Sequence, residues 1–163
     1  MSTIPLCVHA DDPLTKPIPK QQVARLGFDP SGKLYMIVQV HTGKVLGIFN
    51  DSDADGQQAM LVDDDIVNQS RQWTIKNDGD FIKFINQKSE KALDVFGGHK
   101  TDETPIIQWH DKSVNATLPA GDANGGFDNQ FWIWDGQGNE RRIKNKFSEL
   151  VLDIDDTNHI VQR

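Results

Sequence analysis

The sequence has almost no thiol chemistry, because Cys7 is the only cysteine among 163 residues. One cysteine excludes an intramolecular disulfide and a thiolate zinc cluster, and the five histidines show no zinc-ligand spacing. Apolar runs are also short, and none approaches the ~20 residues that cross a bilayer. Basic charge is in deficit, with 17 basic against 24 acidic residues and a net charge of -7. We therefore expect neither nucleic-acid binding nor membrane insertion, since anionic surfaces repel such a chain.

Signals of secretion and catalysis are missing as well. Residues 1–12 lack a basic stretch followed by an apolar run, so we expect a cytoplasmic protein, with non-classical release left open. The sequence contains no Gly-x-Ser-x-Gly, phosphate-loop or Rossmann glycine pattern. Carboxylate pairs are inevitable among 24 acids and carry no argument for a glycosidase. We expect no enzyme activity and no cofactor.

What is present is a pattern of short strands and turns. Apolar residues alternate in runs such as 35–40 and 81–85, which are separated by clusters of Gly, Asp and Asn. No amphipathic helix is evident. Residues 1–20 carry four prolines and little periodicity, and they are interpreted as an N-terminal arm. The sequence predicts an all-β protein.

The sequence also repeats itself. At an offset of 47 residues Leu26 matches Trp73 and Leu46 matches Leu93, and at an offset of 59 Trp73 matches Trp132. Each unit then contains four short strands, giving twelve strands in three repeats at about 21–65, 66–111 and 128–163. One unit cannot bury its own apolar face, so the three must close around an axis. We predict a pseudo-threefold β-trefoil as a single domain over 21–163, with residues 22–28 as the strand that closes it.

Several motifs resemble those of one family. They are Leu93-Asp94-Val95, Thr104-Pro105-Ile106-Ile107-Gln108-Trp109, Arg71-Gln72-Trp73 and Asn129-Gln130-Phe131-Trp132. Together they resemble the ricin-B-like lectins, whose units carry a Gln-x-Trp signature. The resemblance covers roughly residues 21–163 and implies one shallow sugar pocket per unit. In such a pocket an Asp accepts hydrogen bonds from sugar hydroxyls, an aromatic side chain stacks on the ring, and an Asn completes the polar contacts.

Carried over residue by residue, the resemblance implies its best carbohydrate site in the second unit. That unit has Asp94, Trp109 and Asn129, with His110 as a further donor. The third unit keeps Asp153 but has Arg163 in place of the aromatic residue. The first unit has Gly47 in place of the Asp and Asp63 in place of the aromatic residue, so we expect it to bind nothing.

Each of these residues has a purely structural interpretation beside the functional one. Trp73 and Trp132 are interpreted as core residues rather than ligand contacts. Trp109 is either a sugar platform or a buried strand residue. Asp94 and Asp153 bind ligand or stabilise turns through nearby backbone.

One acidic segment resembles the start of a calcium loop. Asp51, Asp53 and Asp55 alternate before Gly56, but Val62 stands where the bidentate Glu belongs. A solvated acidic turn is the favoured interpretation, and no metal is expected.

The leading hypothesis is a lectin that binds glycans or glycoproteins of the galactose or N-acetylgalactosamine type, as the resemblance implies. Its implied role is defence, and a homodimer is left open. The alternative is a β-trefoil without sugar binding, acting as a protease inhibitor or protein-interaction module through loops such as 111–128.

Overall fold

The computed structural model describes residues 7–9, 16–17, 34–65, 67–112, 128–136 and 140–163, and this part of the chain is all-β as predicted. Short 3-10 turns punctuate the strands, and no helix in these ranges is long and apolar enough to cross a membrane. The strands are β1 (Cys7–His9), β2 (Lys16–Pro17), β3 (Tyr35–Met36), β4 (Val45–Ile48), β5 (Ala59–Val62), β6 (Trp73–Asp78), β7 (Phe81–Asn86), β8 (Ala92–Val95), β9 (Ile106–Trp109), β10 (Trp132–Asp135), β11 (Glu140–Asn145), β12 (Leu152–Ile154) and β13 (Ile160–Gln162). The turns are η1 (Phe49–Asp51), η2 (Gln69–Arg71), η3 (Phe96–Gly98) and η4 (Asp128–Gln130).

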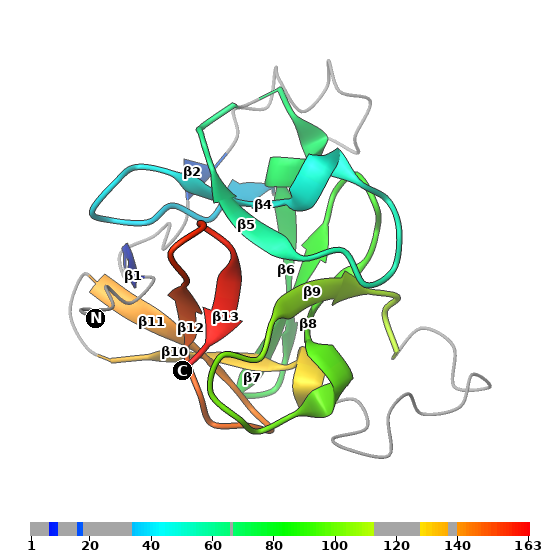
Figure 1. Ribbon diagram of the computed structural model, residues 1–163, viewed down its shortest axis with the longest axis vertical. Helices are drawn as coiled ribbons and strands as arrows, with labels where there is room; N and C mark the ends of the chain where they lie inside the picture. The colour runs from blue at the N-terminus through cyan, green and yellow to red at the C-terminus, as the bar shows by residue number, and fades with distance from the viewer. Residues whose placement is uncertain (1–6, 10–15, 18–33, 66, 113–127, 137–139) are drawn as a thin grey trace.

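Three antiparallel hairpins, β4–β5, β8–β9 and β12–β13, surround a common centre (Figure 1). Single bridges join them in a closed ring: Gln58 to Ile107, Pro105 to Val161, and Met60 to His159. Every hairpin therefore contacts both others, which gives each unit's inward residues a neighbour on either side. This ring is the threefold closure that the repeat predicts.

The repeat is visible in individual hydrogen bonds. The indole of Trp73 donates to the Leu46 carbonyl at 3.0 Å, and the indole of Trp132 donates to the Leu93 carbonyl at 3.2 Å. Both tryptophans are fully buried in the central core, so their interpretation as core residues is confirmed. An indole must satisfy its N–H when buried, and these carbonyls do so.

The turn that follows the second strand also repeats. Gly43, Glu90 and Glu149 occupy the same place in the three units, and all have positive φ, at 73°, 60° and 63°. Glycine adopts this conformation without the steric cost that a Cβ brings, whereas the two glutamates do not have that freedom. The backbone geometry of the unit therefore holds even where the residue type does not favour it.

The N-terminal segment takes part in the sheet. Strand β1 pairs with β11 so that Val8 lies opposite Arg141. The equivalent pairs elsewhere in the repeat are Trp73 opposite Tyr35 and Trp132 opposite Ile82. Strand β2 pairs with β3. The pairing position expected for Leu26 is thus held by Val8, while residues 22–28 lie outside the described ranges. The proposed limits of the arm and of the domain stay predictions.

Candidate functional site

The β8–β9 hairpin presents one face to the core and the other outward. Directly opposite residues of an antiparallel pair share a face. Leu93 opposite Gln108 and Val95 opposite Ile106 are all fully buried and form the inward face. The other face holds Asp94 opposite Ile107 and Trp109 opposite Ala92. The acidic and aromatic residues of the predicted site therefore lie on one face of one hairpin.

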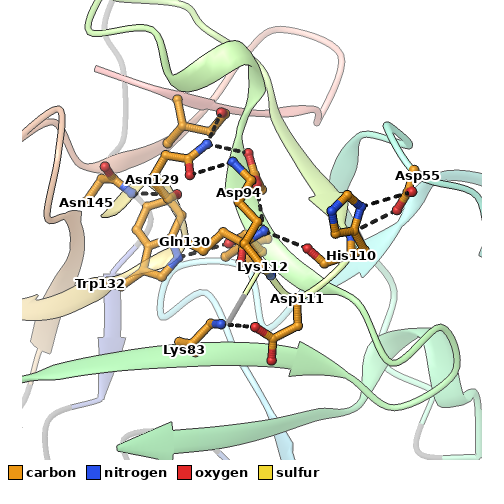
Figure 2. A network of polar contacts seen from close by, with 12 residues as sticks. Asp55, Lys83, Asp94, His110, Asp111, Lys112, Asn129, Gln130, Trp132 and Asn145 are labelled. Atoms are coloured by element: carbon orange, nitrogen blue, oxygen red, sulfur yellow. Dashed lines mark hydrogen bonds and ion pairs between the residues drawn. The ribbon is translucent and has the colours of Figure 1, made fainter. Parts of the chain in front are cut away.

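Asp94 is buried and both of its carboxylate oxygens accept hydrogen bonds. The side chain of Asn129 donates to Oδ1 at 2.9 Å, and the side chain of Gln130 donates to Oδ2 at 2.8 Å (Figure 2). Turn η4, immediately before β10, supplies both amides. The structure thus brings Asp94 and Asn129 together, as the resemblance implies.

The fourth side chain of this group is Lys112, which is 3% exposed. Its ammonium lies 3.6 Å from Asp94 Oδ2 and donates to Asn129 Oδ1 at 3.0 Å. Its backbone N–H donates to the Gln130 side chain at 3.1 Å. The buried carboxylate therefore has a buried counter-charge, and four side chains form one polar cluster, which we call the Asp94 cluster: Asp94, Lys112, Asn129 and Gln130.

Sequence reasoning missed two members of this cluster. Gln130 belongs to the Gln-x-Trp signature, which in the sequence serves as a marker of the fold. Lys112 follows β9 by three residues, and no spacing rule shows that its long side chain folds back onto β8. Its only sequence signal is a position directly after the polar pair His110-Asp111.

Trp109 and His110 are half-buried at the edge of the Asp94 cluster. Their ring centroids are 5.4 Å apart. The His110 backbone donates to Asp55 Oδ1 at 2.9 Å, and its ring Nδ1 lies 3.4 Å from Asp55 Oδ2. Asp55 comes from the loop of the first unit, so the site contains a residue from a neighbouring repeat.

That loop is fastened to the second unit. The Gln108 side chain donates to the carbonyls of Ser52 and Ala54 at 2.9 and 2.8 Å. Gly56 has a φ of +85°, and a Cβ built on it would lie 3.8 Å from the Trp109 ring. The loop therefore passes close beside the indole and forms a wall of the site.

The acidic residues of this loop have separate protein partners. Asp51 accepts a hydrogen bond from the Ser70 hydroxyl, Asp53 lies 3.8 Å from Lys88, and Asp55 lies 3.6 Å from Lys91. Within the described ranges no group of three candidate metal-ligating side chains gathers. The three carboxylates serve as contacts between repeats.

We expect Asp51→Asn to change the pH dependence of stability. The hydrogen bond from Ser70 is the largest effect on the pKa of Asp51; burial opposes it, and Asn68, Arg71 and Lys88 also help to lower the pKa below 3.8. A lowered pKa stabilises the fold above the unfolded-state value, and this contribution is lost as pH falls through the folded-state pKa. The variant should be about 1 kcal/mol less stable at neutral pH, with the difference vanishing in acid.

Denaturant unfolding across pH measures this effect. Asp53→Asn in the same loop is the matched control, because Asp53 is exposed and should change stability by less than about 0.5 kcal/mol at any pH. A constant difference between Asp51→Asn and the wild type at every pH would contradict the assignment.

In the third unit, Arg163 occupies the position that corresponds to Trp109 and contacts the acid that corresponds to Asp94. Arg163 pairs with Val151 as Trp109 pairs with Ala92, and its guanidinium lies 3.3 Å from buried Asp153. The same guanidinium donates to Glu103 Oε2 at 3.0 Å, and hydrogen bonding to Glu103 is the main cause that raises the pKa of Arg163. The structure thus places Asp153 against a protein cation, away from the other four predicted site residues.

The first unit differs from the sequence prediction in one residue. Gly47 lies opposite Met60, as Asp94 lies opposite Ile107, which confirms that Gly47 replaces the acid. The aromatic position is held by Val62, opposite Val45, and the assignment to Asp63 was wrong by one residue. A Cβ on Gly47 would lie 2.8 Å from Val62 Cγ2, so this unit has neither the acid nor room for it.

The ring of three hairpins with repeated core tryptophans defines a β-trefoil. Residues 22–109, more than half of the chain, match the model of the family described as ricin-type β-trefoil lectin domain-like. The chain belongs to this family. No curated protein shows a significant sequence match to it.

Solved structures share the fold. The chain is similar to ThreeFoil, a designed threefold-symmetric protein, at 24% identity and a TM-score of 0.65, over 79% of this chain and 87% of that one. It is similar to an exo-β-1,3-galactanase from Clostridium thermocellum at 26% identity and a TM-score of 0.63, over 80% and 26%. It is also similar to a Polyporus squamosus lectin, bound to a human-type influenza-binding epitope, at 19% identity and a TM-score of 0.58, over 78% and 41%. The chain thus spans less than half the length of the last two.

Proposed function

We propose that this chain is a carbohydrate-binding protein without catalytic activity, and that its site is the outer face of the β8–β9 hairpin. One observation carries the proposal: Asp94 gathers Asn129 and Lys112 on the same face of the hairpin that holds the half-buried Trp109. A carboxylate, an amide and an ammonium together accept from and donate to sugar hydroxyls, while an indole face suits the apolar side of a sugar ring.

The ligand enters by displacing Lys112 from Asp94. At 3.6 Å the ammonium makes a charge contact with Asp94 Oδ2 but not a short hydrogen bond. A sugar hydroxyl that reaches this oxygen replaces the ammonium as a partner of the carboxylate. Lysine carries its charge on a flexible four-carbon stem, so the ammonium can turn to donate to the ligand instead.

For the ligand we propose galactose or N-acetylgalactosamine residues of glycans or glycoproteins. The axial 4-hydroxyl of galactose lies next to the 3-hydroxyl on the same side of the ring, so one carboxylate can accept from both. The family supports this class, and the names of two similar structures refer to a galactanase and to a galactose-containing glycan. Cytoplasmic location, a role in defence and homodimer formation stay proposals.

A glycan array on the wild-type protein and on Trp109→Ala tests the site. We expect a defined set of galactose-terminated glycans for the wild type and at least about tenfold weaker binding for the variant, because the stacking surface is lost. Val62→Ala changes the same register position in the first unit and should leave binding unchanged.

Two outcomes would count against the site. If Trp109→Ala binds glycans as tightly as the wild type, the site lies elsewhere. Silence of a folded wild-type protein on the array would favour the interaction-module alternative. Of its loop, residues 111–128, the stretch 113–127 lies outside the described ranges.

A further inference from the structure

A pocket lies next to the proposed site, on the other side of the segment 110–112. Its lining includes Thr74, Lys76 and Ile85 from the β6–β7 hairpin, Glu90 and Lys91 from the turn before β8, and His110 and Asp111. Thr74 lies opposite Ile85 and Lys76 opposite Lys83, so these four side chains share the outward face of the hairpin. Asp111 covers this face through its ion pair with buried Lys83 (Figure 2).

The pocket and the proposed site share one short segment of chain. Lys112 turns to the Asp94 cluster, whereas His110 and Asp111 line the pocket. The His110 ring, at the pocket's edge, is 5.4 Å from the Trp109 ring, centroid to centroid. A ligand ring stacked on Trp109 therefore lies beside His110, which is one of the residues that line the pocket.

The charges in and behind the pocket balance. Two bases, Lys76 and Lys91, and two acids, Glu90 and Asp111, line the pocket. One further charge of each sign pairs with a lining residue: Lys83 with Asp111, and Asp55 with Lys91 at 3.6 Å. An anionic ligand would meet no excess of positive charge. Donors and acceptors side by side, with Ile85 as an apolar patch, suit neutral hydroxyl groups, which both donate and accept.

We propose that this pocket is a second saccharide subsite, and that the protein recognises a neutral disaccharide or longer glycan rather than a single terminal sugar. This inference rests on the proposed function, because the first sugar must sit at Trp109. Glu90 accepts from hydroxyls of the second unit and Lys76 donates to its oxygens. Both side chains are exposed and make no ion pair with any other residue that the structure describes.

Calorimetric titration with methyl β-galactoside, lactose, galactobiose and sialyllactose tests the subsite. We expect a neutral disaccharide to bind about tenfold more tightly than the monosaccharide, which corresponds to one or two added hydrogen bonds to charged groups. Glu90→Gln and Lys76→Gln should each remove part of this gain and leave monosaccharide binding unchanged.

Glu149→Gln is the matched control. Glu149 occupies the same turn of the third unit with nearly the same φ, 63° against 60°, so the substitution repeats the local change away from the pocket. It should alter neither affinity. Thermal unfolding of all three variants checks that the fold is intact.

The outcomes separate the subsite from the site itself. If both disaccharides bind no more tightly than methyl β-galactoside, or if Glu90→Gln and Lys76→Gln behave like the control, the subsite is refuted and the site at Trp109 stands. A preference for sialyllactose that Lys76→Gln abolishes would replace the neutral ligand with an anionic one. A wild type that binds none of these sugars refutes the proposed function, and the subsite with it.

Discussion

Asp94→Ala should abolish glycan binding and lower the free energy of unfolding by about 3–5 kcal/mol, the cost of breaking a buried ion pair from one side. The variant takes the Asp94 carboxylate away from the buried ammonium of Lys112. It also removes one acceptor from each of the Asn129 and Gln130 amides, which keep their bonds to the Val95 and His110 carbonyls. Buried donors that lose their partner keep the full cost of desolvation. Urea unfolding and the glycan array measure the two effects.

Two further variants separate stability from binding. Asp153→Ala makes the same change in the third unit, where Arg163 keeps its bonds to Glu103, so the stability loss should be smaller and glycan binding should persist. Adding Lys112→Met to Asp94→Ala removes the buried charge that no longer faces the Asp94 carboxylate, and it should recover part of the stability but none of the binding. If Asp94→Ala binds glycans normally, the carboxylate is a structural group only.

Trp132→Ala should cost about 3–5 kcal/mol of unfolding free energy, whereas Trp109→Ala should cost much less. Trp132 is fully buried in the central cluster, and its loss leaves both a cavity and an unpaired Leu93 carbonyl. Trp109 is half-buried beside the first unit's loop. The two tryptophans are therefore expected to report on different properties, the first on folding and the second on ligand binding.

Denaturant unfolding of both variants, read beside the array, checks this division. Trp73→Ala should match Trp132→Ala, because Trp73 holds the equivalent place and donates to the equivalent carbonyl. A loss for Trp109→Ala as large as that for Trp132→Ala would show that Trp109 is a core residue, and the sugar-platform interpretation would fail.

The fold was predictable because the residues that repeat along the sequence are the ones that face the core. Trp73 and Trp132, like Leu93 and Leu152, recur at fixed offsets since each fills the same position around one axis. The approach of Asn129 to Asp94 was likewise implied by motifs in register. Such positions depend on strand pairing, which sequence spacing reports directly.

The remaining features depend on contacts that spacing does not report. Lys112 reaches Asp94 through a flexible side chain whose direction no periodicity fixes. Asp55 meets His110 only because the ring of hairpins closes, a contact between residues of different repeats. Val8 holds a strand position from within a proline-rich segment that gives little strand signal. The aromatic position of the first unit was assigned to Asp63 instead of Val62 for the same reason, because only the strand register identifies that position.

The first unit lacks the acidic and aromatic residues of the proposed site, yet its loop forms a wall of that site in the second unit. Asp55 holds His110 in place, and Gly56 allows the chain to pass close to Trp109. The second repeat alone would therefore keep Asp94 and Trp109, but it would lose Asn129, which the third repeat supplies, and the wall that the first repeat's loop forms. A repeat without a site of its own can therefore still be required for the proposed site of its neighbour, because it holds one wall of that site in position.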